Sequence, residues 1–97
     1  MSKVQQHYDE IADIYDDHYG GYRGRSYHRH ISDHVMSVLP KGGLLLDLGC
    51  GTGLFVKRYI EESGRAVGLD ISPRMVCYGR RRCPESGFCV GTADVLP

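Results

Sequence analysis

The sequence lacks net charge, long apolar runs and closely spaced cysteine pairs, and each absence excludes a class of protein. Its 97 residues include 12 Lys and Arg against 12 Asp and Glu, so the formal net charge is +0 at pH 7. A general nucleic-acid-binding protein would have a strongly basic face, and we therefore expect no nucleic-acid partner. No apolar run approaches the roughly 18–20 residues of a membrane span, and residues 1–7 are too polar for a secretion signal. We expect a cytoplasmic protein without a membrane span.

The four cysteines do not follow the spacing of a zinc site or a disulfide framework. Cys50, Cys77, Cys83 and Cys89 form no C-x-x-C pair, and no histidine follows His34. Structural zinc sites usually draw their ligands from such short spacings, so we expect no metal site. Without a secretory context, reduced thiols are the expected state of all four cysteines.

The first 40 residues predict two helices. Apolar and tyrosine side chains recur at helical spacing over residues 4–19, and the acidic residues lie largely on the other faces. A Gly-Gly pair then ends this helix. Ser26 is the expected cap of a second helix, which closes before Pro40.

Residues 41–97 alternate short apolar runs with helical segments. The run Leu44–Leu48 is expected to be a strand buried on both faces. The further expected elements are a helix over 54–63, a strand over 66–70, a helix over 73–82 and a strand over 88–91. Alternating strands and helices imply parallel pairing with right-handed crossovers. The sequence therefore predicts an α/β fold.

A glycine loop joins the first strand to the next helix. Gly49, Gly51 and Gly53 allow a tight turn there, and the helix that follows points free N–H groups at a ligand. In a parallel sheet, ligands bind at this edge, where the strands end. Asp70 ends the next strand, at the spacing of an acid that accepts hydrogen bonds from ribose hydroxyls. Asp94 follows the third strand, where a ligand contact and a solvated carboxylate both remain open.

The spacing of the loop glycines separates two classes of nucleotide. The dinucleotide fingerprint is G-x-G-x-x-G, whereas this loop is G-x-G-x-G with Asp47 two residues before its first glycine. An acid so close to the loop suits a ligand with an amino group and a sulfonium better than one with two phosphates. A nicotinamide-type oxidoreductase is therefore the less favoured alternative.

The segment Leu45–Gly53 closely resembles the first motif of class I S-adenosylmethionine (SAM)-dependent methyltransferases. Gly68–Met75 resembles the second conserved segment of that family, and Gly91–Pro97 resembles the third. Residues 8–16 are similar to the helical lid of its small-molecule, quinone-biosynthesis-like branch. The resemblance implies a Rossmann-like parallel sheet that holds three strands, in the order 3-2-1, of a seven-strand fold.

The same resemblance divides the chain and implies roles for single residues. Segment 1–40 would be a lid, and segment 41–97 an incomplete SAM-binding domain. Asp47 would hold the methionine amino group, Asp70 the ribose hydroxyls and Asp94 the adenine amino group. The other implied SAM contacts are Gly49, Cys50, Gly51, Gly53, Ile71, Ala93 and Tyr15. Four residues are open candidates for closing over the methionine end: Tyr8, Tyr15, Tyr22 and Arg23.

We assign no catalytic residue, because the expected reaction requires few chemical groups from side chains. Methyl transfer from a sulfonium depends mainly on holding the donor against the acceptor, which we expect to be a small molecule. A three-strand sheet would expose a leucine-rich edge along residues 44–48, so we expect self-association, an exchange of elements between copies, or a longer natural protein. The alternative function is a truncated, non-catalytic module that holds the cofactor weakly or not at all.

Overall fold

The protein has four helices and three strands in its described part. The computed structural model describes the backbone of residues 2–20, 22–62 and 64–95, and the side chains of residues 2–14, 29–62 and 64–95. In chain order the elements are α1 (Lys3–Gly20), α2 (Tyr22–Val38), β1 (Leu44–Leu48), α3 (Leu54–Glu62), β2 (Arg65–Asp70), α4 (Pro73–Arg82) and β3 (Gly87–Val90). The strands form one parallel sheet in the order β1-β2-β3. The predicted α/β fold and strand order are confirmed.

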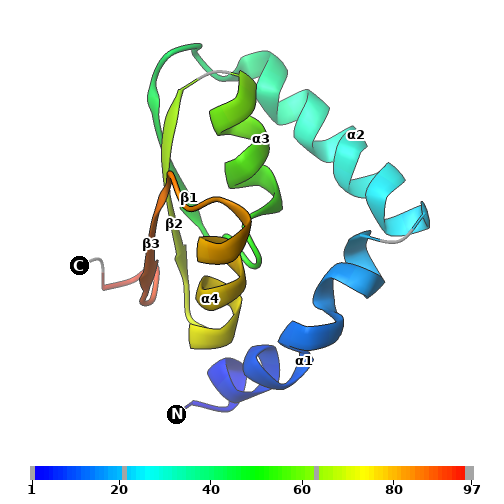
Figure 1. Ribbon diagram of the computed structural model, residues 1–97, viewed down its shortest axis with the longest axis vertical. Helices are drawn as coiled ribbons and strands as arrows, with labels where there is room; N and C mark the ends of the chain where they lie inside the picture. The colour runs from blue at the N-terminus through cyan, green and yellow to red at the C-terminus, as the bar shows by residue number, and fades with distance from the viewer. Residues whose placement is uncertain (1, 21, 63, 96–97) are drawn as a thin grey trace.

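All four helices lie on one side of the sheet (Figure 1). Helices α3 and α4 pack directly on the strands, whereas α1 contacts α2 and α4. Because α1 lies at the end of α4 where that helix begins, the first residues of the chain come close to the edge of the sheet where the strands end. None of the helices in the described part of the chain is long and apolar enough to cross a membrane.

Two expectations about local structure are wrong. Helix α2 begins at Tyr22, four residues before the expected cap at Ser26, so Gly24 lies inside the helix. A glycine in a helix costs only about 1 kcal/mol relative to alanine, which is too little to stop one. Strand β1 is also not buried on both faces: Leu44, Leu46 and Leu48 remain 66%, 49% and 46% exposed. Their face of the sheet carries no helix among those described.

The core lies between the sheet and the helices α3 and α4. Its main members are Cys50, Val56, Tyr59, Ala66, Val76, Cys83 and Phe88. A Cβ atom at Gly68 or Gly79 would lie 2.8 or 2.6 Å from the Phe88 ring, so both positions need glycine for α4 to approach the sheet this closely. The same packing brings α4 beside the loop that follows β1, where a Cβ atom at Gly53 would lie 3.3 Å from the Gly79 Cα atom.

Candidate functional site

The glycine loop between β1 and α3 has the backbone that its sequence predicts. Gly49, Gly51 and Gly53 have φ angles of 80°, 57° and 81°, in the left-handed region that favours glycine. The backbone N–H groups of Gly49 and Cys50 both donate to the carbonyl of Leu69, at 2.7 and 3.0 Å, and so tie the loop to β2. A Cβ atom at Gly49 would meet nothing within 4 Å. The space above Gly49 is therefore open to a ligand.

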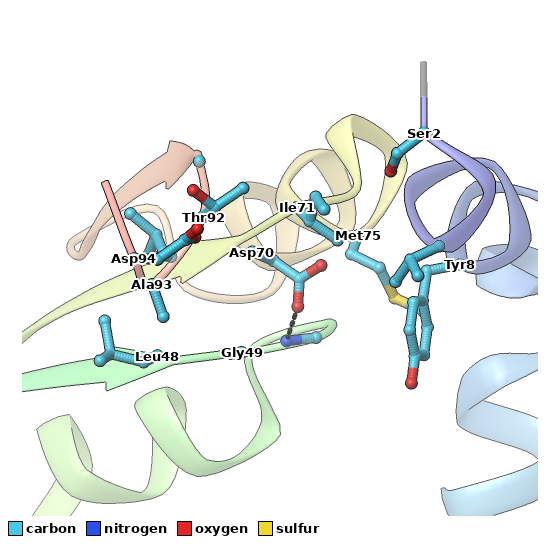
Figure 2. Close-up of a pocket in the computed structure, with 14 residues that line it drawn as sticks. Ser2, Tyr8, Leu48, Gly49, Asp70, Ile71, Met75, Thr92, Ala93 and Asp94 are labelled. Carbon is cyan, nitrogen blue, oxygen red and sulfur yellow. Dashed lines mark hydrogen bonds between the residues drawn. The ribbon is translucent and has the colours of Figure 1, made fainter. Parts of the chain in front are cut away.

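Asp70 is held rigidly at the end of β2. Its side chain is buried, with the residue 9% exposed. Oδ2 accepts a hydrogen bond from the Gly51 N–H at 2.8 Å, shown dashed in Figure 2, and Oδ1 accepts one from the Ser72 N–H at 3.0 Å. The two oxygens of a carboxylate offer about four acceptor positions, so about two remain for a ligand's hydroxyl groups. The structure thus gives Asp70 a fixed orientation and unused acceptor capacity.

A pocket of about 520 Å³ opens beside Asp70, within the usual size range of small-molecule sites. Figure 2 shows Asp70 between Tyr8 on the α1 side and Asp94 on the β3 side. The pocket brings together six of the predicted site residues: Gly49, Gly51, Asp70, Ile71, Ala93 and Asp94. They come from three separate stretches of chain, as expected for a site at the carboxyl ends of parallel strands.

The segment after β3 forms one end of the pocket. The Gly91 N–H donates to the Asp70 carbonyl at 2.9 Å, which fastens this segment to β2. Beyond it, Asp94 is exposed, and a hydrogen bond from the Thr92 side chain lowers the pKa of its carboxyl. Asp94 is therefore an ionised acceptor at the rim of the pocket.

Three predicted site residues do not line this pocket. Asp47 lies on the helix-covered face of β1 and borders a separate pocket of about 270 Å³ below α2. Cys50 points into the core, where burial, with smaller effects from Asp70 and Asp47, raises the pKa of its thiol to about 12. A Cβ atom at Gly53 would lie 3.1 Å from the Phe88 ring, so this glycine serves the packing of the loop on the core.

The lid expected from the sequence includes Tyr8, but two further residues that border the pocket, Val4 and Met75, were not among the predicted site residues. Val4 and Tyr8, one turn apart on α1, both border the pocket, and Met75 of α4 borders it as well. The i, i+4 spacing of Val4 and Tyr8 is the signal that could have identified Val4. The side chains of Tyr15, Tyr22 and Arg23, the other candidates, lie outside the described residues.

Comparisons with known proteins agree with this geometry. A dTDP-3-amino-3,6-dideoxy-alpha-D-glucopyranose N,N-dimethyltransferase of Streptomyces fradiae is 38% identical over 80 residues, which are 79% of this chain and 31% of that enzyme. The chain thus spans about a third of the length of this relative.

Two solved structures share the fold. The [4+2]-cyclase SpnF superposes with a TM-score of 0.85 at 23% identity, over 98% of this chain and 43% of that one. Magnesium protoporphyrin IX methyltransferase (ChlM) of Synechocystis PCC 6803, solved with SAM bound, superposes with a TM-score of 0.78 at 21% identity, over 97% of this chain and 55% of that one.

A family model described as "Methyltransferase domain" matches residues 45–97, more than half of the chain. These residues include the glycine loop, Asp70 and the segment after β3, which form the pocket together with α1. The chain therefore belongs to the methyltransferase-domain family.

Proposed function

We propose that this chain is the cofactor-binding part of a SAM-dependent methyltransferase that acts on a small molecule. The observation that carries the proposal is the Asp70 carboxylate, fixed by two backbone N–H groups beside the open space over Gly49. Asp70 would bind the ribose hydroxyls through its remaining acceptor positions. Ile71 and Ala93 would then contact the adenine, with Asp94 accepting from its amino group.

The chain's own residues would bind and orient the cofactor rather than react with it. SAM supplies an activated methyl group on a sulfonium, and the rate of transfer depends mainly on holding that group against the acceptor. Tyr8 of α1 lines the same pocket as Asp70, so it would contact the methionine end of the bound cofactor. Segment 1–40 would act as a lid over that end, and segment 41–97 as the cofactor-binding domain.

The comparisons support SAM as the cofactor and a small molecule as the acceptor. ChlM shares the fold and holds SAM, and the Streptomyces fradiae relative is named for the dimethylation of an amino sugar. SpnF shares the fold but is named a [4+2]-cyclase, so the fold alone does not assign methyl transfer. Binding without methyl transfer is therefore our second candidate.

We also propose that copies of this chain associate through β1. Leu44, Leu46 and Leu48 are about half or more exposed on one face, and within the described residues β1 pairs on one side only, with β2. Unpaired strand edges and apolar patches of this kind are templates for association. A cytoplasmic location remains our proposal, supported by four cysteines that are all free thiols.

Calorimetric titration tests the proposed function. We expect S-adenosylhomocysteine to bind and NAD not to bind. Asp70→Asn should weaken S-adenosylhomocysteine binding by roughly 1.5–3 kcal/mol, the usual contribution of hydrogen bonds to a charged group. Asp33→Asn, an exposed change on α2, is the matched control and should bind as the parent chain does. Binding of NAD alone, or of neither ligand, would overturn the proposal.

A further inference from the structure

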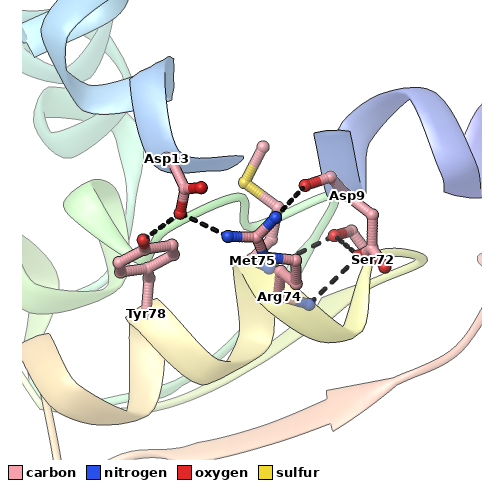
Figure 3. Close-up of polar contacts among 6 residues, drawn as sticks. All are labelled: Asp9, Asp13, Ser72, Arg74, Met75 and Tyr78. Carbon is pink, nitrogen blue, oxygen red and sulfur yellow. Dashed lines mark hydrogen bonds and ion pairs between the residues drawn. The ribbon is translucent and has the colours of Figure 1, made fainter. Parts of the chain in front are cut away.

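Helix α1 presents two different faces to the rest of the molecule. Val4 and Tyr8 border the pocket, whereas Asp9 and Asp13, also one turn apart, face the beginning of α4 (Figure 3). The sequence alone places these acidic residues largely away from the apolar face of the helix and names no partner for them. In the structure they join α1 to a helix that begins more than 60 residues later in the chain.

Asp9 occupies the N-terminal end of α4 as a helix-capping group would. Its Oδ1 accepts hydrogen bonds from the Ser72 hydroxyl and, at 3.1 Å, from the Arg74 N–H. Its backbone carbonyl also accepts a hydrogen bond from the Arg74 guanidinium at 3.3 Å. A carboxylate is favoured here because the free N–H groups of a helix end and the helix dipole attract negative charge.

Asp13 extends the same contact by one helical turn. Its Oδ1 forms an ion pair with the Arg74 guanidinium at 2.5 Å and accepts a hydrogen bond from the Tyr78 hydroxyl. Hydrogen bonds from Tyr78 and Arg74 lower the pKa of the Asp13 carboxyl, which is therefore ionised at neutral pH. We call these five residues, Asp9, Asp13, Ser72, Arg74 and Tyr78, the α1–α4 latch.

Ser72 connects the latch to the pocket. It is completely buried, and its hydroxyl donates to Asp9 while it accepts from the Met75 N–H at 3.2 Å. Its own backbone N–H donates to Asp70 at 3.0 Å. Ser72 therefore links the Asp9 carboxylate, which holds α1, directly to the Asp70 carboxylate, which faces the pocket.

We propose that Asp9 and Arg74 are positioning residues that hold α1 closed over the cofactor pocket and thereby slow the release of the cofactor. The inference rests on the proposed function, since it concerns the same pocket. Opening α1 would carry Val4 and Tyr8 away from the pocket and would remove the Asp9 acceptor from Ser72. Neither Asp9 nor Arg74 borders the pocket, so their effect passes through α1 and Ser72.

The molecule contains a matched ion pair away from the pocket. Arg58 of α3 contacts Asp33 of α2 at 2.5 Å, the same distance as Arg74 to Asp13, and the side chains of Asp33 and Asp13 are 56% and 53% exposed. Neither Arg58 nor Asp33 borders the pocket beside Asp70. A change at Asp33 thus removes an equivalent contact between helices without touching the latch.

The test measures the rate at which S-adenosylhomocysteine leaves the immobilised full chain by surface plasmon resonance. We expect Asp9→Ala and Arg74→Met to raise the dissociation rate about five- to tenfold, the range for losing a partly exposed charged contact. Arg74→Lys keeps the charge and should restore most of the parent rate, and Asp33→Ala should leave it unchanged. Hydrogen exchange in the ligand-free chain should rise at the amides of α1 in Asp9→Ala and Arg74→Met, and not in Asp33→Ala.

The outcomes separate this inference from the function on which it rests. A parent chain that binds no S-adenosylhomocysteine overturns both. A parent chain that binds, with an unchanged dissociation rate in Asp9→Ala and Arg74→Met, overturns the inference alone. An equal rise in Asp33→Ala also overturns it, because the effect would then come from a general loosening of the helices. Thermal unfolding of each ligand-free variant shows whether the variant is folded.

Discussion

The two faces of the sheet differ in what covers them: helices pack on one face and none of the described helices packs on the other. On the covered face, Gly68 and Gly79 leave room for the Phe88 ring at distances that no Cβ atom could tolerate. On the open face, Leu44, Leu46 and Leu48 have large side chains with no helix over them among those described. The covered face therefore fixes the position of α4, and with it Ser72 and Asp70, whereas the open face is free to contact another molecule.

The largest expected difference between buried and exposed positions concerns thiol reactivity. Cys50 is buried on the covered side and its pKa is about 12, whereas Cys77 is exposed. The thiolate is the reactive form, so at pH 9 Cys50 in the folded chain should react with iodoacetamide about a thousandfold more slowly than the same thiol in urea. Mass spectrometry of the labelled chain should find Cys77 modified first. Equal labelling of both cysteines would contradict the assignment of Cys50 to the core.

The second prediction concerns close packing on the covered face. Gly79→Ala places a Cβ atom 2.6 Å from the Phe88 ring, and such overpacking costs about 1–3 kcal/mol. This loss should exceed the gain of about 1 kcal/mol that alanine brings to a helix, so urea unfolding should show lower stability. The control is Gly87→Ala, whose Cβ atom would lie 3.3 Å from a Val67 methyl group. Adding Phe88→Leu to Gly79→Ala should recover part of the loss; no recovery would mean that Phe88 is not the obstacle.

The sequence predicts the parts of the molecule that depend on local backbone demands. The positive φ angles of the glycine loop follow from its glycines, and the capping of α4 by Ser72 follows from a serine placed directly before Pro73. The parallel sheet follows from the alternation of strands and helices, and the approach of Asp70 to Gly51 follows from the sheet. Each of these features can be read within a few residues or from the order of the elements.

The features that the sequence does not predict depend on where distant segments meet. Asp9 and Asp13 belong to a polar helix face, and nothing within α1 indicates that this face meets α4. Arg82 lies in the last turn of α4, where its charge would suit the carbonyl end of that helix, but it donates to the Thr52 carbonyl at 3.0 Å in the glycine loop. A continuous apolar run such as Leu44–Leu48 implies cover on both faces without showing which segment supplies it, and the helices of the described part cover only one face of β1.

The sharpest comparison of the two faces uses two neighbouring residues of β1, and the change on the open face should have the smallest effect on stability. Leu45 packs against the core, whereas Leu46 points to the open face and is 49% exposed. Leu45→Ala should lower the free energy of unfolding by about 2 kcal/mol, and Leu46→Ala should change it by no more than about 0.5 kcal/mol.

Leu46→Lys should leave the folded chain stable but prevent its association, because a lysine on an edge strand disfavours pairing with another copy. Light scattering over a range of concentrations should then find the parent chain associated and this variant monomeric. A parent chain that stays monomeric at every concentration would remove the proposed association and would leave the open face to a different partner. If Leu46→Ala proves as destabilising as Leu45→Ala at concentrations where the chain is monomeric, another part of the same chain covers the open face, and the contrast between the two faces does not hold.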